Sequence, residues 1–256
     1  MNVAADPRLR AIADAHPRPL LFATISGAHL YGFPSPDSDF DLRGVHVLPL
    51  REVIGLRRGP ETLERMALEQ GLDLDIVTHD VGKFVRLMAK PNGYVLEQLL
   101  SPLVVVTTPF HQELCALGRR CMTRQHVRHY LGFGTSQWQL FASEEPPRVK
   151  PLLYVYRVLR TGLHLLRTGE LLADLSVLDQ QAKLPQVAEL IARKRQGAEQ
   201  GTLAAHELPF HRQQFERLFE ALRQAPEYSP LPATLPNEVG DALHAFLVRV
   251  RLQERG

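Results

Sequence analysis

Cysteine is nearly absent from the chain, since only Cys115 and Cys121 occur among 256 residues. They form no CxxC pair and have none of the Cys/His spacing of a zinc site, so we expect two free thiols and a reducing cytoplasm. Long uncharged apolar runs are also missing, and residues 1–17 are polar and charged. The sequence therefore favours neither a signal peptide nor a membrane span.

A strong excess of either charge is absent as well. The formal net charge of +2 is too small to indicate nucleic-acid binding by itself. Residues 1–110 carry 11 Lys/Arg and 13 Asp/Glu, net −2, whereas residues 111–256 carry 19 and 15, net +4. The second part is therefore the better candidate for binding a polyanion. The hydrophobic content of 45% is ordinary for a globular protein.

The first 110 residues predict a small mixed sheet with flanking helices. Compact apolar or alternating runs indicate strands at 20–25, 39–48, 71–78 and 103–106. Helices are expected at 7–15, 51–56, 81–90 and 94–100. Asp80 has the position and the side chain of an N-cap for the third of these helices. We expect this part to form a domain of its own.

Beyond Pro109 the pattern is helical nearly throughout. Helical windows occur at 111–122, 126–142, 150–168, 180–197, 209–224 and 236–253. The spacing is clearest in the third window, which ends at Gly169, a residue suited to the left-handed conformation that terminates helices. The predicted fold class is thus α+β, with a sheet domain at 1–110 and an all-α domain at 111–256.

Two carboxylates follow a glycine turn at the end of the first strand. The chain reads Ser26-Gly27-Ala28, then ten residues, then Asp39-Phe40-Asp41. Side chains alternate along a strand, so Asp39 and Asp41 would point the same way and could share a divalent cation. Gly27 would let the backbone approach a phosphate closely. This pattern indicates metal-assisted handling of a nucleoside triphosphate.

A third carboxylate from a neighbouring strand would complete such a site. Asp75 is our candidate and Asp73, on the same face of the same strand, is its competitor. With Asp39 and Asp41 it would hold two divalent cations, and it would assist deprotonation of an attacking hydroxyl. Taken singly, each of these residues is more simply a turn or loop residue, and only the combination favours chemistry.

The motifs resemble those of the DNA polymerase beta superfamily of nucleotidyltransferases, whose signature is Gly-Gly/Ser, a spacer near ten residues, then Asp-x-Asp/Glu. They are most similar to a branch of bacterial nucleotidyltransferases associated with RNA-repair gene clusters. The matching stretches are Ser26-Gly27-Ala28-His29-Leu30-Tyr31-Gly32 and Ser38-Asp39-Phe40-Asp41-Leu42-Arg43-Gly44-Val45. Later matches include Asp75, Lys83, Arg157 and Thr168-Gly169-Glu170, so the resemblance spans about residues 20–175.

The resemblance implies transfer of a nucleoside monophosphate from an NTP to an acceptor hydroxyl, with release of pyrophosphate. It implies Mg²⁺ or Mn²⁺ as cofactor in a two-metal site, held by Asp39, Asp41 and Asp75. The acceptor would be an RNA or tRNA end, or a partner protein as in toxin-modifying relatives. The helical domain would serve as a lid for acceptor or nucleotide. Candidates for nucleotide or phosphate binding are Ser26, Gly27, Ala28, Ser38, Arg43, Lys83, Lys150, Tyr154 and Arg157.

Several alternatives stay open at this point. Ala28 stands where the family has a serine that helps to hold the triphosphate, which leaves a catalytically inactive nucleotide-binding module as the second hypothesis. Arg43 could bind a phosphate or simply neutralise the acids, and surface charge is the simpler explanation for each lysine. The aromatic and histidine side chains of the helical part are candidates for an acceptor groove or a base platform, or they belong to the core: His126, His129, Tyr130 and Trp138.

Overall fold

The computed structural model describes residues 3–182, 184–197 and 201–253. Contacts between Cα atoms divide the chain into two compact units. The sheet unit consists of Met1–Gly27, Asp39–Met122 and Leu235–Gly256, and the helical unit consists of Ala28–Ser38 and Thr123–Thr234. Each unit therefore combines segments that are distant in the sequence. Within the described part of the chain, no helix is long and apolar enough to cross a membrane.

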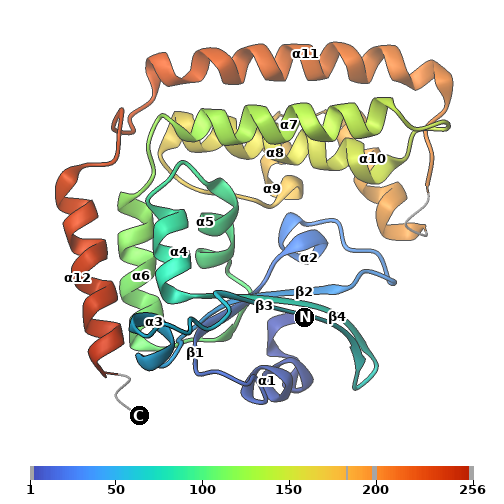
Figure 1. The fold of residues 1–256 in the computed structure, drawn as a ribbon. Coiled ribbons are helices and arrows are strands. Elements are labelled where there is room, and N and C mark those ends of the chain that lie inside the picture. Colours follow the sequence, from blue (N-terminus) through green and yellow to red (C-terminus); the bar gives the residue numbers. More distant parts are fainter. Residues whose placement is uncertain (1–2, 183, 198–200, 254–256) are drawn as a thin grey trace. The chain divides into compact units, whose positions relative to one another are not determined.

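A five-stranded mixed sheet forms the centre of the sheet unit, with strand order β3-β4-β2-β1-β5 (Figure 1). β2 and β4 are parallel, and the other neighbouring pairs are antiparallel. The bounds are β1 (Leu20–Ile25), β2 (Phe40–His46), β3 (Thr62–Glu69), β4 (Leu72–Asp80) and β5 (Val104–Val106). The parallel pair aligns acidic residues of two strands side by side.

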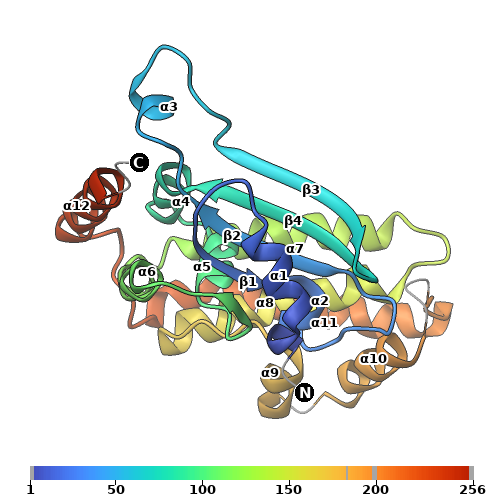
Figure 2. The ribbon, with the colours of Figure 1, turned by 90° about the horizontal axis from the view of Figure 1, so that it is seen from below.

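Helices cover both faces of this sheet. On one face lies α1 (Pro7–Asp14), which Figure 2 shows from below. Its Leu9 and Ile12 are buried against the sheet. On the other face lie α4 (Val81–Met88), α5 (Gly93–Leu99) and α6 (Pro109–Arg120) (Figure 1). There the ring of Phe22 contacts Phe84 with 5.6 Å between centroids. Burial on both faces explains why β1 reads as a continuous apolar run.

The C-terminal helix α12 (Asn237–Gln253) belongs to the sheet unit and lies beside α6 (Figure 1). Arg251 near its end forms a buried ion pair with Asp80 and donates to the Leu48 carbonyl at 3.0 Å. Asp80 also accepts from the Gly82 N–H at 2.9 Å, which confirms its predicted role as the N-cap of α4. One carboxylate therefore joins the start of α4 to the end of α12.

The helical unit is built around α8 (Val149–Thr168), which is buried on nearly every side. A Cβ added at Gly162 would lie 2.7 Å from Tyr130, so the glycine permits α8 and α7 to approach closely. The other elements are α2 (Gly27–Tyr31), whose first residue belongs to the sheet unit, α7 (His126–Ala142), α9 (Leu175–Ala182), α10 (Pro185–Gln196) and α11 (Leu208–Gln224). Short helical turns are η2 (Ala205–Glu207) and η3 (Ala225–Tyr228) in this unit, and η1 (Val3–Ala5) and α3 (Arg51–Ile54) in the sheet unit.

The α+β class and the predicted strands are confirmed, with two corrections to the elements. The window predicted at 180–197 is helical for the most part but is not one helix, because α9 ends at Ala182 and Pro185 occupies the first turn of α10. The edge strand β3 was not predicted, since its Met66 and Leu68 are exposed and give no buried face to recognise. The domain boundary at residue 110 stays a prediction, because contact density does not test which parts fold separately.

Arg251 and Arg249 offer a matched test of what holds α12. Arg251→Leu should lower the free energy of unfolding by about 3–5 kcal/mol, because it leaves the buried Asp80 carboxylate without its cation. Arg249→Leu breaks an exposed ion pair with Glu113 and should cost at most about 1 kcal/mol. Urea unfolding followed by circular dichroism measures both. Equal effects of the two changes would contradict the assignment.

Candidate active site

The candidate site begins where β1 ends against β2. The Ser26 N–H donates to the Asp41 carbonyl at 2.9 Å, which continues the strand pairing into the turn. Gly27 follows with φ +61°, and a Cβ placed there would lie 1.7 Å from the Asp41 carboxylate oxygen Oδ2. Only glycine fits both the left-handed backbone and this close approach. The turn therefore places its backbone directly against one acidic side chain.

Asp41 and Asp75 are direct partners in the register of the parallel strands β2 and β4. Arg43, two residues after Asp41 and on the same strand face, lies between them. Its Nη2 donates to Asp41 Oδ1 and to Asp75 Oδ2, each at 2.6 Å. Arg43 therefore neutralises both acids in this structure, and its phosphate-binding role stays a prediction.

The Arg43 guanidinium is almost fully enclosed, with 5% of the residue exposed. Its Nη1 donates to the Asp75 carbonyl at 2.6 Å, and its Nε donates to the Tyr94 hydroxyl at 3.2 Å. Burial by itself would lower the pKa of Arg43, but the interactions with Tyr94, Asp41 and Asp75 outweigh burial and raise that pKa. Arg43 is therefore a permanent positive charge at this position.

The remaining acids differ in position. Asp39 directly precedes β2, which begins at Phe40 rather than at the predicted residue 39. Asp75 is half-buried and pairs with Arg43, whereas Asp73 is exposed. The geometry thus brings Asp75 rather than Asp73 to Asp41. The roles of Asp39, Asp41 and Asp75 as catalytic groups and metal ligands stay predictions.

The residues present fit a divalent cation in their chemistry, because carboxylate oxygens are the ligands that Mg²⁺ prefers. Within the described residues, however, no three His, Cys, Asp or Glu side chains are grouped closely enough to hold a metal ion. The Arg43 guanidinium lies between Asp41 and Asp75 and pairs with both. The Ser26 hydroxyl is buried and has no hydrogen-bond partner among the described residues, as expected of a group that awaits a ligand.

Two predicted phosphate ligands have partners within their own units. Lys83 Nζ donates to the Thr62 hydroxyl on β3. Ser38 Oγ accepts from the Ser35 N–H at 2.9 Å and lies 3.0 Å from Ser35 Oγ, which is a loop-stabilising arrangement. The proposed phosphate contacts of both residues stay predictions. Tyr94, in contrast, was missed by sequence reasoning, because only the fold brings it to Arg43.

In the helical unit, Arg157 is buried within a group of aromatic rings. Its guanidinium carbon lies 3.9 Å from the centroid of Tyr31 and 5.8 Å from that of Tyr154. The Tyr31 and Tyr154 rings meet edge to face at 5.6 Å. Lys150 lies half-buried in the first turn of α8. The motif residue Tyr31 is thus the packing partner of Arg157, and the nucleotide-binding roles of Lys150, Tyr154 and Arg157 stay predictions.

Of the aromatic and histidine candidates, His126, Tyr130 and Trp138 pack inside the helical unit. His126 is fully buried and Tyr130 is too, which does not suit a surface groove. Trp138 stacks on Phe215 with ring centroids 4.4 Å apart, so its face is covered within the unit. Both observations favour the structural explanation over the acceptor-binding one.

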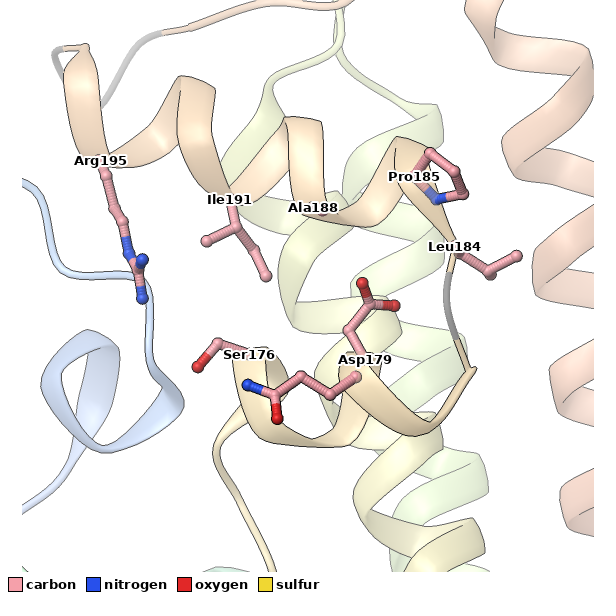
Figure 3. Close-up of a pocket in the computed structure, with 8 residues that line it drawn as sticks. Ser176, Asp179, Leu184, Pro185, Ala188, Ile191 and Arg195 are labelled. Carbon is pink, nitrogen blue, oxygen red and sulfur yellow. The ribbon is translucent and has the colours of Figure 1, made fainter.

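A cavity of about 430 Å³ lies between α9 and α10 in the same unit (Figure 3). Asp179 and Ser176 reach it from α9, and Ile191 and Arg195 reach it from α10. None of the predicted site residues lines it. The sequence motifs therefore do not mark this cavity.

The close approach at Gly27 predicts a specific sensitivity. Gly27→Ala should lower the free energy of unfolding by at least about 1–2 kcal/mol, because a left-handed residue gains a Cβ that collides with Asp41. Gly240→Ala in α12 is the control, since its Cβ would meet no atom within 4 Å and should stabilise by about 0.5–1 kcal/mol. Chemical denaturation measures both. A stabilising Gly27→Ala would contradict the geometry.

Comparisons with known proteins identify the family of the chain. The model of the RNA repair pathway DNA polymerase beta family matches residues 1–249. Protein MJ0002 of Methanocaldococcus jannaschii is 31% identical over 160 residues, which cover 61% of this chain and 64% of that protein. YcgL of Bacillus subtilis is 25% identical over 231 residues, covering 84% of this chain and 86% of its own.

A solved structure, a nucleotidyltransferase-like protein from Exiguobacterium sibiricum, aligns over 98% of this chain and 80% of its own. Its identity is 13% and its TM-score is 0.32, a likeness that carries no argument about the site. The resemblance inferred from the motifs is confirmed by the family match alone. The chain belongs to the RNA repair pathway DNA polymerase beta family.

Proposed function

We propose that this protein is a metal-dependent nucleotidyltransferase that transfers a nucleoside monophosphate from an NTP to an acceptor hydroxyl and releases pyrophosphate. One observation carries the proposal. Asp41 and Asp75 stand in register on adjacent parallel strands, share one arginine, and adjoin a glycine turn that has room for no side chain. Family membership supports the same class of reaction.

Three carboxylates have the principal roles in the proposal. Asp39, Asp41 and Asp75 would hold Mg²⁺ or Mn²⁺, and such ions would stabilise the charge on the entering and leaving oxygens. Asp75 would also accept the proton of the attacking hydroxyl. Because Asp75 extends from β4 and Asp41 from β2, the sheet itself sets the spacing between these two groups.

Arg43 would have a different role in each state of the site. In the structure it neutralises Asp41 and Asp75, which would otherwise repel each other across neighbouring strands. When the carboxylates are neutralised by cations, the same guanidinium can donate to phosphate oxygens, for which its planar fork is well suited. Arg43 would thus keep the two acids paired until substrate and cations are present.

Other residues would hold the triphosphate. The Gly27 backbone and the buried, unpartnered Ser26 hydroxyl support a phosphate contact at the turn. Ala28 offers no hydroxyl, and we expect this to weaken phosphate binding by about 1 kcal/mol rather than to abolish it. Ser38, Lys83, Lys150, Tyr154 and Arg157 are further candidates, and the helical part would serve as the lid.

An RNA end is the favoured acceptor, since the family model is that of an RNA repair pathway and residues 111–256 carry a net charge of +4.

A reducing cytoplasm suits such a reaction. Within the described chain both cysteines are free, and burial raises the pKa of Cys121 to about 11. A low-reactivity thiol of this kind is a structural residue rather than a redox group.

The test supplies each labelled NTP with Mg²⁺ or Mn²⁺ and total RNA. The expected result is label on RNA and release of pyrophosphate. Asp41→Asn and Asp75→Asn should each lower the rate about 100-fold or more, because each removes a charge that holds the cation. Asp73→Asn is the matched control on the same strand and should retain activity. A blocked 3′ end on a synthetic RNA should prevent labelling if the 3′ hydroxyl is the acceptor.

Three outcomes would overturn the proposal or its parts. Transfer that survives the double change of Asp41 and Asp75 would remove these residues from the mechanism. Label that resists ribonuclease but is lost on proteolysis would show a protein acceptor. NTP binding without transfer, under either metal and with RNA or cell lysate as acceptor, would establish the inactive module.

A further inference from the structure

A second cavity of the helical unit has a strongly basic lining. It has a volume of about 460 Å³ and lies between α8, α9 and α11. Four basic side chains line it, namely Arg160, His164, Arg167 and Arg217. Its apolar walls include Leu178 and Leu218, and among the described residues that line it there is no Asp or Glu. None of the residues assigned to nucleotide transfer lines this cavity.

Arg160 is the unusual member of this set. Only 5% of the residue is exposed, and its Nη1 donates to Asp179 Oδ1 at 2.6 Å. Its Nε and Nη2 are buried and have no hydrogen-bond partner among the described residues. These two nitrogens form one edge of the guanidinium plane, the edge that binds two oxygens of a phosphate or carboxylate side by side. Buried donors without acceptors are costly, so their presence points to a ligand.

The two other arginines lie at the exposed rim of the cavity. Within the described chain neither Arg167 on α8 nor Arg217 on α11 forms an ion pair. Arg223, which lies on α11 like Arg217, does pair with Glu220. Glu170 acts on His164 but does not line the cavity. Asp179 balances one of the three arginine charges. The cavity therefore keeps a surplus of positive charge that nothing in its lining neutralises.

We propose that this cavity binds a small phosphorylated molecule, with a phosphate group between Arg160, Arg167 and Arg217. A phosphate is a near-dianion at neutral pH, and its charge would neutralise the surplus positive charge of Arg160, Arg167 and Arg217. The volume suits a molecule between pyrophosphate and a mononucleotide in size. The leucine walls favour a compact ligand with an apolar or planar remainder.

The chain of an RNA fits less well than a small molecule. An RNA backbone is read by exposed cations along a surface, whereas Arg160 lies at a buried position behind two rim arginines. This inference does not rest on the proposed transfer reaction, since no residue of the cavity belongs to the carboxylate site.

The test is calorimetric titration of the full chain with inorganic phosphate, pyrophosphate and AMP in the presence of EDTA. Chelation keeps divalent cations away from Asp39, Asp41 and Asp75, so binding there is suppressed. We expect one metal-independent site for at least one of these probes, with affinity that falls as salt rises. Arg167→Ala combined with Arg217→Ala should weaken it at least tenfold without affecting folding, since both side chains are exposed.

Two further variants sharpen the assignment. Arg160→Lys keeps a charge for Asp179 but removes the two-nitrogen edge, so binding should fall tenfold or more. Arg212→Ala on α11 is the matched control, because Arg212 is exposed and does not line the cavity. It should leave the affinity unchanged, as should Asp41→Asn.

The inference is overturned if none of the three probes binds in EDTA. It is also overturned if the rim variant, Arg167→Ala combined with Arg217→Ala, binds the probes as tightly as the unchanged protein does. Binding lost in Asp41→Asn but kept in the rim variant would assign the probe to the carboxylate site instead. A short RNA without terminal phosphates that binds through Arg167 and Arg217, while the probes do not, would show an RNA surface and also overturn it. Failure of nucleotide transfer alone would leave these results unaffected.

Discussion

The sharing of Arg43 between Asp41 and Asp75 is the interaction on which the site depends. Two carboxylates in register on adjacent strands would repel each other and destabilise the pairing of β2 with β4. The buried guanidinium turns that repulsion into two short ion pairs, and removing one partner of such a group typically costs about 3–5 kcal/mol. The centre of the sheet is therefore stable only while the acids have a positive partner.

That requirement connects stability with chemistry. A site that must always hold positive charge is suited to exchange one positive partner for another. The carboxylates would exchange the arginine for divalent ions, which accompany the triphosphate. The glycine turn of Gly27 adds a steric condition, because it holds backbone against the Asp41 carboxylate where any side chain would collide. Arg160 with Asp179 uses a related device in the helical unit, but there an unpartnered edge of the guanidinium is left.

Local signals in the sequence predicted much of the fold. The apolar run at 20–25 is β1, Asp80 caps α4, and α8 ends at Gly169 with φ 78°. Each of these three features depends only on a few neighbouring residues, so it can be predicted from the amino-acid sequence. β3 was missed because an exposed edge strand has no buried face to give a periodic pattern. The helix expected at 180–197 is divided because Pro185 cannot continue a preceding helix.

The sequence by itself determined the family, the glycine turn and the acids that follow it, because these are matters of residue type and short spacing. Only the tertiary structure decided that Asp75 rather than Asp73 meets Asp41, that Arg43 pairs with both, and that Tyr94 supports Arg43. It also decided that Tyr31 packs on Arg157. The physical reason is that strand register and helix packing join residues far apart in the sequence, such as Arg43 with Asp75, 32 positions away, and with Tyr94, 51 positions away. No local pattern encodes which of them will meet.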